Sequence, residues 1–169
     1  MPVTRWSREA VPRNSPILLD LGLLLAWTAW AGAVSLIDVR HGRVSNRWFL
    51  LVLPLVLLTV LYRYPTLRVA MLFGALGLLL ALILNLPAWT QGWMGGADVK
   101  AYAVIGLGFG PVHFVEIFLA ASLLFGVAAL LVRMRGAGGP DRLVMLPAVG
   151  LGLVIWLWSG PWWLGESVL

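Results

Sequence analysis

Long apolar runs, repeated along most of the chain, constrain this fold more than any other feature. A helix needs roughly 20 apolar residues to cross the ~30 Å hydrocarbon core of a lipid bilayer. Four runs reach that length, and they cover residues 17–37, 69–89, 112–132 and 143–163. A fifth run, residues 48–62, needs flanking residues to cross, and a sixth, residues 101–110, is too short to cross as a helix. The sequence therefore predicts about six transmembrane helices, the fourth of them short.

The composition agrees with a membrane protein. The chain holds 12 basic and 7 acidic residues among 169, so that 11% of it is charged, against about 25% in soluble domains. Its 61% hydrophobic content excludes both a water-soluble globular fold and a disordered chain. Because there is no cysteine, a disulfide framework, a thiolate zinc site and an iron–sulfur cluster are excluded as well. We expect an all-α polytopic membrane protein in a lipid bilayer, with no metal and no organic cofactor.

The basic residues predict an orientation in the membrane rather than a nucleic-acid partner. Arginine and lysine collect in short loops on the cytoplasmic side of a membrane. Seven of them fall in the loops after the first, third and fifth spans, and five fall on the opposite face. We therefore expect those three loops to face the cytoplasm. Residues 1–16 read as an N-terminal tail and residues 17–169 as a single transmembrane domain.

The first polar cluster lies between the first two predicted helices. Polar residues at membrane depth are costly and are candidates for function by default. Gly42 is suited to end the first helix, and Ser45 or Asn46 is suited to cap the second. Asp38 is then predicted in the last turn of the first helix, at the membrane boundary and close to Arg40.

The second polar cluster opens the short fourth helix. Gly95, Gly96 and Ala97 precede Asp98, and Lys100, the only lysine of the chain, follows it. Because this helix is too short to cross, the simplest geometry lets the glycine-rich turn dip into the protein, with Asp98 below the headgroup level. Irregular backbone at that depth is tolerated only where protein or a wet cavity encloses it.

The two aspartates fall on the same predicted face, so that they can meet. Two carboxylates held close cannot both ionise, and one keeps a proton near neutral pH. That arrangement suits an aspartyl protease, in which the ionised acid takes a proton from water and the protonated acid polarises the scissile carbonyl. Other readings stay open: boundary charges paired with Arg40 or capping a helix beside Lys100, a small carrier that binds a cation or proton, or a non-catalytic assembly subunit.

Both clusters resemble the signatures of one known family. Residues 38–46, Asp-Val-Arg-His-Gly-Arg-Val-Ser-Asn, resemble the first signature of the type IV prepilin peptidases, and residues 95–100, Gly-Gly-Ala-Asp-Val-Lys, resemble the second. The span count and the motif positions are similar as well, over essentially the whole chain. Two positions depart from the family pattern, with Ala97 in place of a glycine and Ser45 in place of a common proline. Alanine disfavours a positive φ, so a site that needs such backbone at position 97 would work more slowly.

The resemblance implies a membrane aspartyl endopeptidase that cuts the basic leader from prepilin-like precursors. The cut would fall on the cytoplasmic side of a prokaryotic inner (plasma) membrane. Residues 17–169 would form a single transmembrane peptidase domain of the short branch that lacks the methyltransferase domain, and Asp38 and Asp98 would be its catalytic pair. Supporting or substrate-binding roles would fall to Lys100, Gly95, Gly96, Ala97, Arg40 and Asn46.

Small residues elsewhere predict close helix packing. Because no strand precedes them, a nucleotide-binding loop is excluded, and glycine in apolar helices lets two backbones approach. These residues are Gly74 and Gly77 in the third span and Gly106, Gly108 and Gly110 in the fourth.

Overall fold

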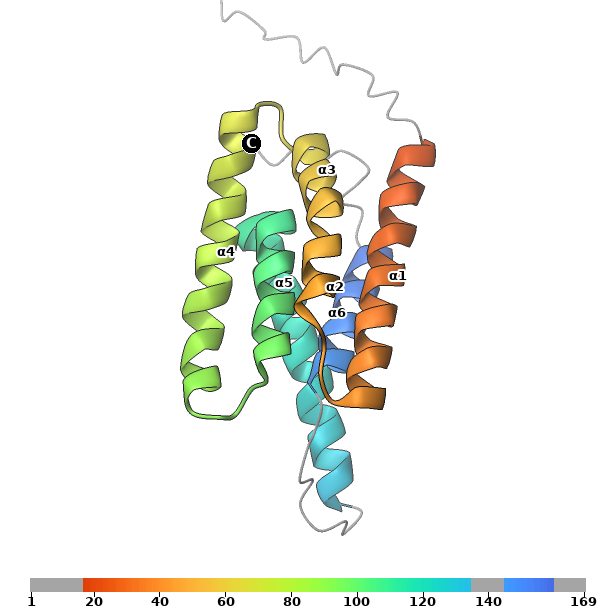
Figure 1. Ribbon diagram of the computed structural model, residues 1–169, viewed down its shortest axis with the longest axis vertical. Coiled ribbons are helices and arrows are strands. Elements are labelled where there is room, and N and C mark those ends of the chain that lie inside the picture. The colour runs from red at the N-terminus through yellow and green to blue at the C-terminus, as the bar shows by residue number, and fades with distance from the viewer. Residues whose placement is uncertain (1–16, 135–144, 160–169) are drawn as a thin grey trace, which may run out of the picture.

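The computed structural model describes residues 17–134 and 145–159, and within those residues it is an all-helical bundle, as predicted. The helices are α1 (Ile17–His41), α2 (Asn46–Leu51), α3 (Leu53–Arg63), α4 (Leu67–Thr90), α5 (Gly96–Met134) and α6 (Leu146–Ser159) (Figure 1). The predicted tail 1–16, the loop predicted after residue 132 from position 135 onward, and both ends of the predicted span 143–163 lie outside the described residues.

Four described stretches are long and apolar enough to cross a membrane. They are Leu19–His41, Asn46–Arg63, Leu67–Thr90 and Gly96–Leu131, and α6 adds a shorter apolar helix. The second stretch shows how the short run 48–62 reaches membrane length, because it takes in flanking residues at both ends, as expected. The side-chain oxygen of Ser45 caps this stretch by accepting from the Arg47 N–H at 3.4 Å, which confirms one of the two predicted caps.

α5 is two helical limbs rather than one rod. Gly110 has φ 76° and ψ 177°, which breaks the helix and lets the chain turn back (Figure 1). Tyr102 and Phe118 prove the reversal, since 16 residues of straight helix would separate them by about 24 Å. Their ring centroids lie 5.3 Å apart. The first limb, residues 96–109, is therefore the predicted short fourth helix, and the second limb covers residues 111–134.

The first limb is held against α4 by direct backbone contact. A Cβ atom on Gly77 would overlap the carbonyl group of Gly106, and one on Gly74 would lie 2.9 Å from the Leu107 carbonyl oxygen. This confirms the prediction that these glycines allow close packing. Gly110 plays the different part of turning the chain, which only a residue tolerant of positive φ does without strain.

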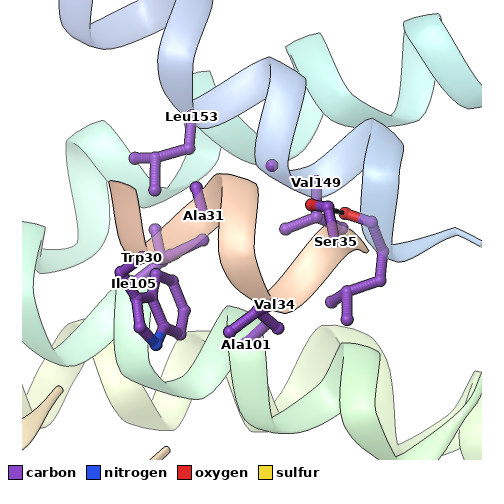
Figure 2. A pocket seen from close by; sticks show the side chains of 10 residues that line it. Trp30, Ala31, Val34, Ser35, Ala101, Ile105, Val149 and Leu153 are labelled. Carbon is purple, nitrogen blue, oxygen red and sulfur yellow. Dashed lines mark hydrogen bonds between the residues drawn. The ribbon is translucent and has the colours of Figure 1, made fainter. Parts of the chain in front are cut away.

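α1 joins the bundle through Trp27 and Trp30 and through α6; Trp30 Nε1 donates to the Trp48 carbonyl oxygen at 3.2 Å. Trp27 is fully buried, packs on Phe109 with ring centroids 4.9 Å apart, and donates from Nε1 to Thr59 Oγ1 at 2.9 Å. Figure 2 shows a small apolar pocket where α1, α5 and α6 meet, with Ser35 donating to the Leu146 carbonyl oxygen at 3.4 Å. α1 is thereby anchored one turn before Asp38.

We predict that Gly77→Ala destabilises the protein by about 1–3 kcal/mol, the usual cost of overpacking a tight interface. The added methyl group would meet backbone that cannot move aside. Thermal unfolding in detergent, followed by tryptophan fluorescence, measures the effect. Gly32→Ala is the matched control, because a Cβ there meets nothing within 4 Å. Equal stability of the two variants would contradict the packing described here.

Candidate active site

Both polar clusters lie at one end of the bundle. α1 runs down to the lower end in Figure 1, α4 also ends there, and α5 begins there. The loop 42–45 and the turn 91–95 therefore lie at the same end of the bundle, although about 50 residues separate them in the chain. This confirms the expectation that the ends of the first and fourth helices share a face.

Asp38 sits in the last turn of α1 and is 8% exposed. Its backbone carbonyl accepts from the Gly42 N–H at 2.8 Å, and Gly42 has φ 61°. A glycine with left-handed backbone just after the last helical residue is a common helix terminator. Gly42 thus ends α1 as predicted and fixes the height at which Asp38 leaves the helix.

Asp98 sits in the first turn of α5 and is 6% exposed. Its Oδ2 accepts from the Gly95 N–H at 3.0 Å, while the Gly95 carbonyl accepts from the Asp98 N–H at 3.1 Å. An acidic side chain at the third helical position that reaches back to the cap residue is one half of a capping box. One carboxylate oxygen of Asp98 is therefore held by the start of its own helix.

The two aspartates lie at the same end of the bundle and interact electrostatically. They lie close enough for the charge of Asp38 to act on the carboxyl group of Asp98. Both are buried, so water screens their interaction far less than it would at a surface. Two acids in that position can hold one proton between them, which gives a base and an acid side by side.

Lys100 links the two motifs without bonding to Asp98. Its Nζ donates to Oδ1 of Asn46, the first residue of α2, at 2.6 Å. Both side chains are exposed, at the rim of the site. Arg40 is also exposed in the last turn of α1. Of the predicted supporting residues, Lys100 and Asn46 therefore form a hydrogen bond between the two motifs, and Arg40 is an exposed charge at the end of α1.

The three residues before Asp98 differ in how closely they are constrained. A Cβ on Gly95 would lie 3.0 Å from Asp98 Oδ2, whereas one on Gly96 would make an ordinary contact, 3.5 Å from Trp89 Nε1. Ala97 is the second residue of α5 and lies in the helix. The concern that position 97 needs a glycine backbone does not apply, because the positive-φ glycines of the described residues are Gly42, Gly92 and Gly110.

Tyr102 is a neighbour of the site that the sequence analysis missed. It is fully buried one helical turn after Asp98, and its hydroxyl interacts electrostatically with that carboxyl group. The i, i+4 spacing from Asp98 was a usable signal, since residues four apart share a helix face. Its other neighbour, Ser122, lies on the second limb and came into reach only through the reversal at Gly110.

A further polar cluster, separate from the two aspartate motifs, lies near the reversal at Gly110. Glu116 accepts from Trp156 Nε1 at 2.7 Å and pairs with His113 Nδ1 at 3.0 Å. The residues described contain no group of three or more histidine, cysteine, aspartate or glutamate side chains placed to hold a metal ion.

We predict that Lys100 and Asn46 are energetically coupled. Lys100→Met and Asn46→Ala should each lower the thermal stability slightly, and the double variant should lose no more than the worse single variant. The coupling should be about 0.5–1 kcal/mol, because the pair is exposed and solvent weakens it. A double-mutant cycle on unfolding in detergent measures it, and simple additivity would contradict the bridge.

One of the comparisons with known proteins gives a match. A family model described as the type IV leader peptidase family matches residues 24–131. That stretch covers more than half of the chain and contains Asp38, Asp98 and the reversal at Gly110. No curated protein and no solved structure matches the chain. With its apolar helices and this match, the chain is a membrane protein that belongs to the type IV leader peptidase family, a family of proteases.

Proposed function

We propose that this protein is an aspartic endopeptidase that removes the basic leader from prepilin-like precursors, with Asp38 and Asp98 as its catalytic pair. The observation that supports the proposal is that two distant motifs each bury a carboxylate at the same end of the bundle, and that these two groups interact electrostatically. Burying an acid costs free energy unless the fold compensates for it, so a pair of buried acids is a candidate functional site.

The chemistry follows from a dyad that shares one proton. The ionised carboxylate takes a proton from water, and the hydroxide so formed attacks the scissile carbonyl carbon. The protonated carboxyl group meanwhile donates its proton to the carbonyl oxygen. When the tetrahedral intermediate collapses, the acid that took a proton from water passes it to the amide nitrogen and the C–N bond breaks. The other carboxylate takes back the proton that it gave to the carbonyl oxygen, so the carbonyl group re-forms and the dyad again holds one proton. Water is thus divided between the new carboxylate of the leader and the new amine of the mature protein.

The membrane geometry suits a substrate with a basic segment followed by a hydrophobic helix. The dyad lies at the end of the bundle where Arg40, Arg43 and Arg47 are exposed, and such a basic face is cytoplasmic by the positive-inside rule. A precursor helix lying in the bilayer would place its own cytoplasmic end at the same level. We therefore propose an inner-membrane enzyme that cuts at the cytoplasmic face.

We expect Asp38→Asn and Asp98→Asn each to lower leader cleavage by about 10²–10⁴-fold or more, because each removes one of the two acids. Purified protein in detergent is incubated with a prepilin-like precursor, and mass spectrometry measures loss of the leader. Asp20→Asn is the matched control, because Asp20 lies at the start of α1, at the other end of the bundle, where Tyr62 donates to it.

Two outcomes would overturn the proposal. Cleavage by both aspartate variants at the wild-type rate would remove the catalytic pair. Proton- or cation-driven flux through wild-type proteoliposomes, lost in both variants and without any precursor cleavage, would favour the carrier instead.

We also predict that Ala97→Gly brings no gain in activity. Ala97 already has helical backbone, so restoring the glycine of the family pattern relieves no strain and costs at most about 1 kcal/mol of helix stability. The cleavage rate should stay within about twofold of the wild type by the same principle. A gain of several-fold in kcat would show that the turn needs a backbone other than the one described.

A further inference from the structure

Tyr102 is the buried polar residue nearest to the dyad along the first limb of α5. It is fully buried, and its ring packs against Phe114 and Phe118 of the second limb, with centroids 5.9 and 5.3 Å away. The two phenylalanines hold the ring in place from one side. The position of the Tyr102 ring is therefore set by its packing against the second limb.

Tyr102 lies on the same face of α5 as Asp98, one turn further along the helix. Side chains in an α-helix lean toward its N-terminus, so a residue at i+4 points back over the residue at i. In agreement, this hydroxyl interacts electrostatically with Asp98, and it also interacts with the side chain of Ser122 on the second limb. It thus stands between an acid and a second hydroxyl.

The two carboxylate oxygens of Asp98 differ in their hydrogen bonding. Oδ2 accepts from the Gly95 N–H, whereas Oδ1 is buried and has no hydrogen-bond partner among the described residues. The Tyr102 hydroxyl likewise makes no hydrogen bond of standard geometry within that part of the chain. Buried polar atoms are almost always satisfied, and a phenol has one proton to donate. An unsatisfied acceptor and an unsatisfied donor on one helix face complement each other.

We propose that Tyr102 is a positioning residue for Asp98 and that its hydroxyl donates to Oδ1 of Asp98 in the reacting enzyme. Ser122 completes the chain by donating to the oxygen of Tyr102. Together the Gly95 N–H and the Tyr102 hydroxyl hold both carboxylate oxygens, which fixes the plane of this carboxyl group relative to Asp38. This inference rests on the proposed function of the dyad.

Tyr102→Phe tests the role, because it removes one oxygen and keeps the ring against Phe114 and Phe118. We expect kcat for precursor cleavage to fall by about 10- to 100-fold, the value of a hydrogen bond to a charged group, with KM unchanged. Ser122→Ala should lower kcat less. Tyr62→Phe is the matched control, since it removes a hydroxyl that serves Asp20 at the other end of the bundle.

A readout without substrate separates positioning from simple stability. With ¹³C-labelled aspartate, the carboxyl signal of Asp98 should shift in Tyr102→Phe and stay in place in Tyr62→Phe, while the thermal unfolding of both variants stays near that of the wild type. Asp98→Asn assigns the signal by removing it.

The inference is overturned when Tyr102→Phe keeps both the wild-type kcat and the wild-type carboxyl signal. It is also overturned when kcat and KM change together with the unfolding temperature, because the hydroxyl would then serve the fold alone. The proposed function survives either result as long as Asp98→Asn abolishes cleavage. A wild-type protein that fails to cut any precursor would overturn the proposed function and the catalytic part of this inference with it.

Discussion

A helix too short to cross the bilayer must be enclosed by protein, and this requirement organises the whole molecule. The first limb of α5 ends at Gly110. Unless other helices surrounded that end, its unpaired backbone groups would be exposed to the lipid interior. α4 provides the closest cover, because Gly77 and Gly106 touch through their backbones with no side chain between them. The same enclosure buries the start of the limb, and Asp98 with it. The burial of this acid therefore follows from the packing of its helix against its neighbours rather than from any local preference of aspartate.

Much of this arrangement was predictable, because run length, glycine and capping residues report directly on local backbone. Gly42 ends α1, Ser45 caps α2, and the short fourth helix stops at Gly110, all as the sequence indicates. A reversal between residues 110 and 112 is implied by reading 101–110 and 112–132 as separate spans, but the part of Gly110 as its turning residue was not predicted, since a glycine in an apolar run signals packing and turning equally well. Contacts that depend on the angle of that turn could not be predicted from the sequence for the same reason. Tyr102 meets Ser122 only because the second limb folds back, and no periodicity in the chain encodes that meeting.

Support for Asp38 comes from outside the stretch that defines the family. The match covers residues 24–131, whereas α6 begins at Leu146. Yet α6 holds α1 one turn before Asp38, where Gly150 leaves room for the Ser35 hydroxyl to reach the Leu146 carbonyl oxygen (Figure 2). A side chain at position 150 would collide with that hydroxyl and push the two helices apart. The position of one acid is thus set by a helix that contributes none of the motif residues.

A capping role and a catalytic role for Asp98 are compatible, because a carboxylate has two oxygens and each oxygen can accept more than one hydrogen bond. One of them accepts from Gly95 and caps the helix, which any aspartate at a helix start would do. A purely structural cap, however, has no need of a second acid nearby, and like charges in a poorly screened interior oppose folding. The fold keeps the pair in spite of that cost, and it leaves the other oxygen of Asp98 buried beside Tyr102. The cap therefore holds the carboxyl group in one orientation through Oδ2, and the proposed hydrogen bond from Tyr102 to Oδ1 would complete that hold.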